Sequence, residues 1–149
     1  MRVLLSWLRE FCPTDAEPSD LAERLTQQGV NVESLSRPWE GLAGVVAARV
    51  LEVRDHPRSD KLCVARVDAG SEVGERRVVV GVRNMAPGDI VPYAPPGARV
   101  PALTEPLGER TLRGELSQGM LCSPWQLAIS PLHLGILILP ADTPAGVDM

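Results

Sequence analysis

The chain has 149 residues, of which 44% are hydrophobic and 23% charged, a composition typical of one ordinary domain or of a small domain with an added module. It contains no run of eighteen apolar residues and no secretory signal pattern, which excludes a helical membrane span and favours an intracellular protein. The net charge is −4, but eleven of the fifteen basic residues lie between residues 45 and 113. An anion-binding surface would therefore have to form there by local clustering.

The beginning of the chain predicts a small α/β module over residues 1–39. Apolar residues at helical spacing indicate a short helix from near Ser6. A second helix is predicted with Ser19 as its N-cap and with Gly29 just after its end. The alternating residues 30–35 then predict a short strand.

The rest of the chain is rich in β-branched residues and follows a predicted linker over residues 38–44. Ser123, followed by proline, predicts the start of a short helix, and residues 135–140 predict a buried strand. This order predicts a mainly β fold, with a five-stranded Greek-key barrel of the OB type over residues 40–149. Strand-like runs separated by Gly, Pro and Asp signals cover residues 45–55, 61–70, 76–82, 89–97 and 110–123, the last with two glycines that predict breaks.

No catalytic or metal-binding constellation is predicted. The glycine motifs of nucleotide sites and the H-E-x-x-H motif are absent. Cys122 follows a glycine and would need a nearby base to act as a nucleophile, for which only His56 and His133 exist. A packed thiol is the favoured interpretation. Three widely spaced cysteines argue against a disulfide framework or a zinc site.

Two basic clusters predict a binding surface. Arg54, Arg58 and the only lysine, Lys61, form the first cluster, and Arg110 and Arg113 form the second. If the fold brings them together, a basic rim forms that contacts phosphate and sugar. The alternative is a solvated face that neighbouring carboxylates neutralise.

Aromatic residues separate two modes of nucleic-acid binding. Residues 45–120 contain only one aromatic, Tyr93, so stacking of a long single strand is poorly supported. Recognition of a folded RNA through its backbone and shape needs fewer aromatic side chains.

Four ordered segments resemble the tRNA-binding OB domain of aminoacyl-tRNA synthetases: residues 56–70, 78–101, 112–127 and 135–140. Residues 5–34 resemble the opening of the bacterial phenylalanyl-tRNA synthetase beta subunit, with its S-W-L segment and its L-A-x-x-L-T-x-x-G helix.

This resemblance implies a cytoplasmic parent enzyme of two alpha and two beta chains that attaches phenylalanine to tRNA with ATP and magnesium. The aminoacylation site of that family lies in the alpha subunit, so this chain is expected to be an N-terminal fragment without a catalytic residue. The family inserts the OB domain into another domain, so we expect residues 1–39 to be less stably ordered than the barrel.

The resemblance also implies a set of tRNA-binding residues. Four positions depart from the family pattern: Arg58 and Ser59 replace an Asn-Ala pair, Val82 replaces an alanine, and Gln126 replaces a glutamate. Two alternatives stay open, a structural or assembly module of the synthetase and a free-standing tRNA-binding protein. The predicted contacts are Arg58, Lys61, Asn84, Arg113, Ser117, Gln118, Met120 and Ser123.

Overall fold

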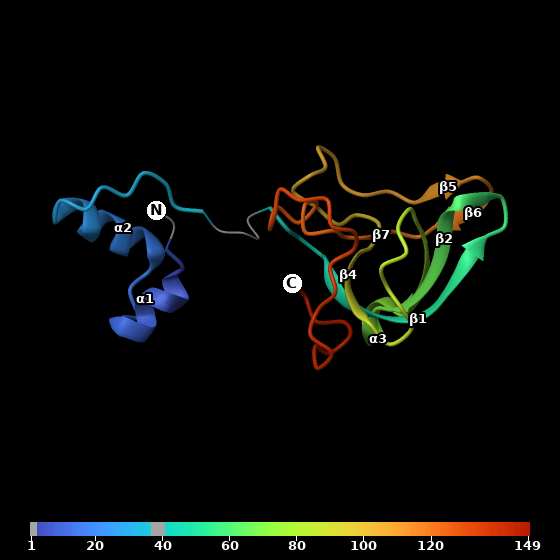
Figure 1. Cartoon of the computed structure of the whole chain (residues 1–149), viewed down its shortest axis with the longest axis horizontal. Helices are drawn as coiled ribbons and strands as arrows, with labels where there is room; N and C mark the ends of the chain where they lie inside the picture. Colours follow the sequence, from blue (N-terminus) through green and yellow to red (C-terminus); the bar gives the residue numbers. More distant parts are fainter. Residues whose placement is uncertain (1–2, 37–40) are drawn as a thin grey trace. The chain divides into compact units, whose positions relative to one another are not determined.

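The computed structural model describes residues 3–36 and 41–149, and the chain divides into two compact units, Met1–Arg37 and Pro38–Met149 (Figure 1). The predicted domain boundary at residues 39 and 40, and the start of the predicted linker, lie outside the described residues. Within the described ranges, no helix is long and apolar enough to cross a membrane.

The first unit contains two helices, α1 over Leu5–Phe11 and α2 over Pro18–Gln27. The predicted N-cap at Ser19 is wrong, because the helix begins one residue earlier at Pro18, whose fixed φ suits the first helical position. The predicted end is confirmed. Gly29 adopts a φ of 87°, and its N–H donates to the Thr26 carbonyl at 3.0 Å, which satisfies one of the last helical carbonyls.

The strand predicted over residues 30–35 is absent, since residues 30–36 belong to no helix or strand. A strand needs a neighbouring strand for its N–H and C=O groups, and the described part of this unit offers only helices. Neither α1 nor α2 buries a side chain. The described part of this unit thus contains two helices and no strand. The lower stability expected of residues 1–39 stays a prediction.

The second unit is built on an antiparallel five-stranded sheet, which confirms the mainly β class. A short helix, α3 (Gly70–Val73), connects β2 to β3. The strands in spatial order are β3 (Glu75–Val80), β2 (Ser59–Asp68), β1 (Val46–His56), β4 (Ile90–Ala94) and β7 (Met120–Leu121).

A separate two-stranded hairpin precedes β7 and pairs β5 (Arg110–Leu112) with β6 (Glu115–Ser117). The predicted run over residues 110–123 is thus broken at its two glycines, as expected. Gly114 and Gly119 have φ values of 89° and 126°, which residues with a Cβ rarely adopt.

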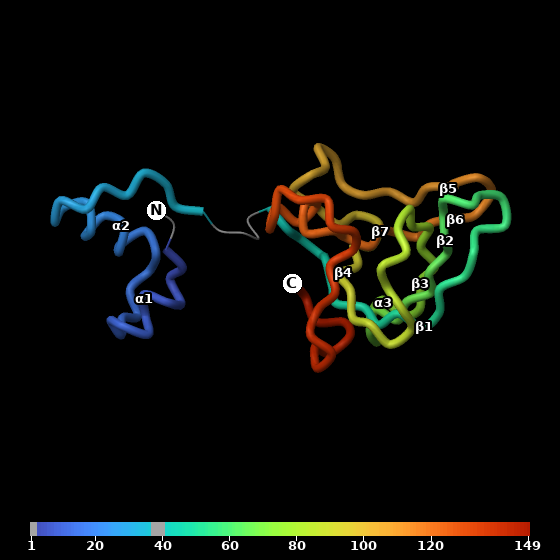
Figure 2. Tube along the Cα trace, in the orientation of Figure 1, coloured from blue at the N-terminus to red at the C-terminus, as the bar shows by residue number. Residues whose placement is uncertain are grey.

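The two ends of the sheet are connected by the segment that follows β6. The Gln118 N–H donates to the Arg77 carbonyl on β3 at 2.8 Å, and the Val79 N–H donates to Ser117 Oγ at 3.0 Å. The ladder bonds themselves leave the sheet open between β3 and β7. The tube in Figure 2 shows the β5–β6 hairpin beside β2 and the β1–β2 turn.

Two groups of buried side chains form the core. One lies under the strands and includes Val50, Val67 and Tyr93, and the other includes Cys122 and Leu127. The Tyr93 hydroxyl donates to the Gln118 carbonyl, so the core also fixes the segment between β6 and β7.

The end of the chain differs from its prediction. Residues 124–129 form turns in place of the predicted helix, although Ser123 and Gln126 exchange two hydrogen bonds of the kind that cap a helix. Ala128 adopts a φ of 57° and Pro131 follows closely, so a helix cannot propagate. Residues 135–140 pair with the sheet only through an isolated bridge between Ile90 and Leu139, so the predicted strand is wrong.

The buried phenol predicts a loss of stability at alkaline pH. Burial raises the pKa of Tyr93 from its usual value near 10 to about 12. Between these values the unfolded chain releases a proton that the folded chain keeps, so the stability present below pH 10 is lost as the pH rises through 12. The phenol alone should increase the unfolding constant by about tenfold per pH unit in this range.

Denaturant unfolding measured at several alkaline pH values tests this expectation. Burial also raises the pKa of Cys122 to about 12, so that thiol contributes a loss of the same sign. Tyr93→Phe should therefore lose the part of the pH dependence that comes from the phenol and keep the part that comes from the Cys122 thiol. Identical pH slopes for the two proteins would contradict the assignment.

Candidate nucleic-acid interface

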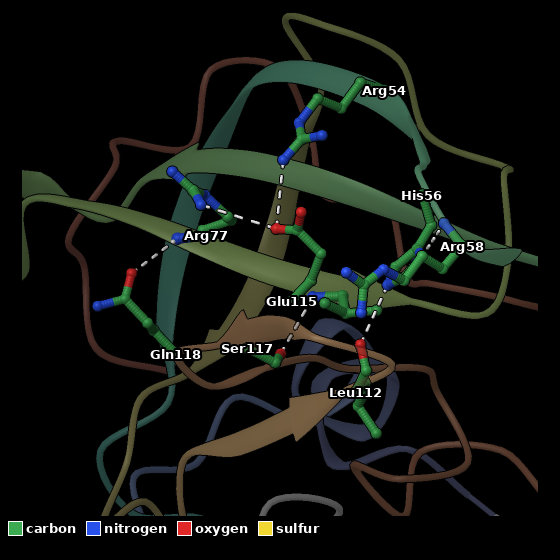
Figure 3. Close-up of polar contacts among 9 residues, drawn as sticks. Arg54, His56, Arg58, Arg77, Leu112, Glu115, Ser117 and Gln118 are labelled. Atoms are coloured by element: carbon green, nitrogen blue, oxygen red, sulfur yellow. Dashed lines mark hydrogen bonds and ion pairs between the residues drawn. The ribbon is translucent and has the colours of Figure 1, made fainter.

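The β1–β2 turn is fixed by a buried histidine. His56 pairs with Ser59, and Pro57 and Arg58 form the turn between them. The Arg58 N–H donates to His56 Nδ1 at 3.1 Å, so the ring proton resides on Nε2 and donates to the Leu112 carbonyl at 3.0 Å (Figure 3). These two hydrogen bonds join the β1–β2 turn to the β5–β6 hairpin through His56, which is only 4% exposed.

This junction brings together two arginines predicted to bind tRNA. Arg113 Nη1 donates to the Arg58 carbonyl at 3.3 Å. The Arg58 guanidinium lies over Gly114, where an added Cβ would come within 2.9 Å of Arg58 Nη1. Among the described residues, neither guanidinium forms an ion pair with a carboxylate. The expected meeting of the two sequence clusters is therefore present at this point.

Lys61 is the third residue of β2, and its side chain is exposed. In the part of the chain that the structure describes, it takes part in no ion pair. Together with Arg58 and Arg113 it forms what we call the turn cluster, three cationic side chains available to an anion.

A carboxylate neutralises the neighbouring part of the basic surface. Glu115 is placed between two guanidinium groups, at 3.3 Å from Arg54 Nη2 and 3.7 Å from Arg77 Nη1 (Figure 3). Its side chain is 18% exposed, which strengthens the attraction relative to a pair in open water. The alternative of a neutralised face thus holds for Arg54 and Arg77 but not for the turn cluster.

Ser117 and Gln118, also predicted to bind tRNA, are occupied by contacts within the protein. The Ser117 hydroxyl is buried at 4% exposure, accepts from the Val79 N–H and donates to the Gly119 carbonyl at 2.9 Å. Gln118 Oε1 accepts from the Arg77 N–H at 3.3 Å. These side chains hold β3 against the end of β6 and the residue that follows it, and thereby position the surface.

Asn84, another residue predicted to bind tRNA, is also held by hydrogen bonds within the protein. Its Nδ2 donates to the Ile136 carbonyl at 2.8 Å, and its Oδ1 accepts from the Ile136 N–H at 3.0 Å. An added Cβ at Gly135 would come within 2.7 Å of Asn84 Oδ1, so this amide fits closely against the backbone of residues 135 and 136.

The remaining predicted residues, Met120 and Ser123, line an open groove of ≈ 350 Å³. Trp125 and His133 line it too, with ring centroids 4.7 Å apart and planes tilted by 33°. Trp125 is not among the residues predicted from the sequence, because it lies beyond residues 45–120, the range in which Tyr93 is the single aromatic residue. An aromatic residue just after the glycine-rich segment is the signal that points to it.

The two buried cysteines, Cys63 and Cys122, are poor nucleophiles. Cys122 is fully buried beside Leu127, and burial raises the pKa of its thiol to about 12, which opposes formation of a nucleophilic thiolate. Burial also raises the pKa of Cys63, whose thiol donates to the Val82 carbonyl at 3.3 Å. No group of three potential metal-ligating side chains occurs within residues 3–36 and 41–149.

A protein-family model described as "Putative tRNA binding domain" matches residues 45–148. The chain belongs to this tRNA-binding domain family. The matched range contains both the turn cluster and the groove, so the surface described above lies within the tRNA-binding domain.

Curated relatives align with the whole length of this chain. The phenylalanine–tRNA ligase beta subunit of Rhodospirillum rubrum is 39% identical over 149 residues, and that of Anaeromyxobacter dehalogenans is 44% identical over 150 residues. Each alignment covers 100% of this chain and 18% of the relative. The tRNA-binding domain is therefore homologous to part of these subunits, and the chain spans about a fifth of their length.

A solved structure supports the fold. The structure titled "Crystal structure of MetRS related protein from Pyrococcus horikoshii" superposes with a TM-score of 0.51, at 20% identity, and covers 78% of this chain and 98% of that one. At this identity the similarity bears on the fold alone.

Proposed function

We propose that residues 40–149 form an OB-type barrel that contacts tRNA as part of a phenylalanine–tRNA ligase beta subunit. The proposal includes residues 1–39 as a separate N-terminal module, an alpha subunit as the partner in a tetramer of two alpha and two beta chains, and a cytoplasmic location. ATP and magnesium belong to aminoacylation by the parent enzyme, and this chain contributes RNA contact. Whole-chain identity to these beta subunits supports the assignment.

The observation that carries the RNA contact is the turn cluster. Arg58 and Arg113, which lie 55 positions apart in sequence, meet through a direct hydrogen bond and are not offset by a carboxylate in the described residues. Arginine suits phosphate through its planar fork, and Lys61 adds a point charge. Contacts of this kind position a backbone without reading a sequence.

Single substitutions test the proposal. Lys61→Ala and Arg113→Ala should each weaken tRNA binding by roughly 3- to 10-fold at low salt and reduce the salt slope of the affinity by about one, because each removes one phosphate contact. Arg24→Ala, in helix α2, is the charge-matched control and should change neither quantity. Binding that neither cluster substitution affects would refute the RNA contact.

An assembly role has one observation in its favour. Leu132, Leu134 and Ile138 are exposed, although they belong to an apolar run near the end of the chain. If this surface docks on another part of the synthetase, deletion of the domain should disrupt assembly. If the domain serves tRNA, deletion should raise the KM for tRNA and leave the oligomer intact.

A further inference from the structure

We propose that the groove beside Trp125 holds one unpaired nucleobase of the bound RNA, stacked on the indole. This inference rests on the proposed tRNA contact and adds a second, base-stacking subsite to it. The groove lies at the end of β3, the same strand that carries Arg77 near the turn cluster, and it is also lined by Met120 of β7 and by Ser123 just after it.

The indole offers the stacking surface. Trp125 is 42% exposed, and its ring packs against His133 at a centroid distance of 4.7 Å, within the range of favourable aromatic pairs. Because His133 supports the indole from one side, a base that stacks on the exposed part needs little ordering of the side chain. Exposed aromatic rings that already have a fixed orientation are the usual platform for unpaired bases.

The end of β3 supplies polar groups beside this ring. Arg77 and Val79 direct their N–H groups away from β2, toward Gln118 and Ser117, so the alternation of a strand directs the Val79 carbonyl and the Gly81 N–H to the same edge. Among the described residues, neither of these two groups forms a hydrogen bond. They present one acceptor and one donor, the combination that the edge of a base requires.

Ser123 adds a further donor. Its Oγ accepts from the Gln126 N–H at 3.3 Å, and within the described part of the chain its own hydroxyl hydrogen has no recorded acceptor. The hydroxyl therefore remains able to donate to a base carbonyl or ring nitrogen.

The dimensions favour a base over a peptide. The groove has a volume of ≈ 350 Å³, near the lower end of small-molecule sites. The edge of β3 is already covered at Arg77 by Gln118 and at Val79 by Ser117 of β6, so within the described residues one carbonyl and one N–H of this edge remain open. A peptide that adds a strand needs a longer open edge.

Binding of two RNA probes to the full chain tests the inference. The probes are a single-stranded RNA of roughly ten nucleotides and a blunt duplex of equal charge. Trp125→Ala should weaken binding of the single strand by roughly 5- to 100-fold and leave duplex affinity unchanged, because only the single strand offers an unstacked base. Trp125→Phe should restore most of the lost affinity. For both Trp125 variants, the affinity should depend on salt with the same slope as for the unaltered chain.

A fluorescence readout makes the test independent of the folding of Trp125→Ala. In a chain with Trp7→Phe and Trp39→Phe, the single strand should quench the emission of Trp125 and the duplex should not. Equal weakening of both probes by Trp125→Ala, or emission unchanged by the single strand, would overturn the base subsite.

The outcomes also separate this inference from the proposed function. If both probes bind with a salt-dependent affinity that Lys61→Ala weakens, while Trp125→Ala has no effect, the tRNA contact stands and the base subsite is wrong. If neither probe nor tRNA binds the unaltered chain at low salt, the proposed function itself fails and the base subsite fails with it.

Discussion

Replacement of Gly119 by alanine is expected to destabilise the second unit by about 3 kcal/mol or more. Gly119 adopts a φ of 126°, which L residues with a Cβ rarely adopt, and its surroundings leave no space for a methyl group. A Cβ there would come within 2.5 Å of the Ala94 carbonyl oxygen and 2.6 Å of Tyr93 Cε2. Both are part of the core or of strand β4, so neither can move without loss of packing.

Urea unfolding followed by circular dichroism measures this loss. Gly108→Ala is the matched control, because Gly108 has no atom within 4 Å of an added Cβ and no positive φ. That variant should unfold within about 0.5 kcal/mol of the unaltered chain. If Gly119→Ala unfolds at the same urea concentration as Gly108→Ala, the close packing around Gly119 is wrong.

Glu115→Gln is expected to tighten tRNA binding by roughly tenfold at low salt. It should also steepen the slope of log affinity against log salt by about one to two, because one to two phosphate contacts are added. The Glu115 carboxylate holds Arg54 at 3.3 Å and Arg77 at 3.7 Å, beside the turn cluster. The neutral amide releases both guanidinium groups to phosphate and adds no cation of its own. Glu115 therefore limits the RNA affinity of this surface.

The control must change the net charge by the same amount. Glu105→Gln does so at an exposed position that forms no ion pair within the described residues. If Glu105→Gln tightens binding as much as Glu115→Gln, the effect comes from overall charge. If Glu115→Gln leaves the affinity unchanged, Arg54 and Arg77 lie outside the RNA-binding surface.

Sequence patterns predicted the strands well wherever the signal was local. Alternating apolar residues placed β1 to β4, and two glycines placed the breaks between β5, β6 and β7. The errors occurred where the outcome depends on partners distant in sequence. Residues 30–35 have the alternation of a strand but no strand beside them, and residues 135–140 reach the sheet only at Leu139.

The candidate site shows a different limit. The pattern around Ser117 and Gln118 indicates a functional segment, yet it cannot separate side chains that contact a ligand from those that hold the segment in place. The structure engages both residues in hydrogen bonds to β3 and leaves Arg58, Lys61 and Arg113 available. Only the folded arrangement shows that Glu115 neutralises Arg54, because the two positions lie 61 residues apart.

The salt dependence of tRNA binding tests the central claim most directly. The logarithm of the affinity should fall linearly with the logarithm of the salt concentration, and simultaneous substitution of Arg58, Lys61 and Arg113 by alanine should reduce the slope by about two to three. The same slope in both proteins, or no tRNA binding at low salt, would contradict the assignment of the turn cluster as the tRNA contact.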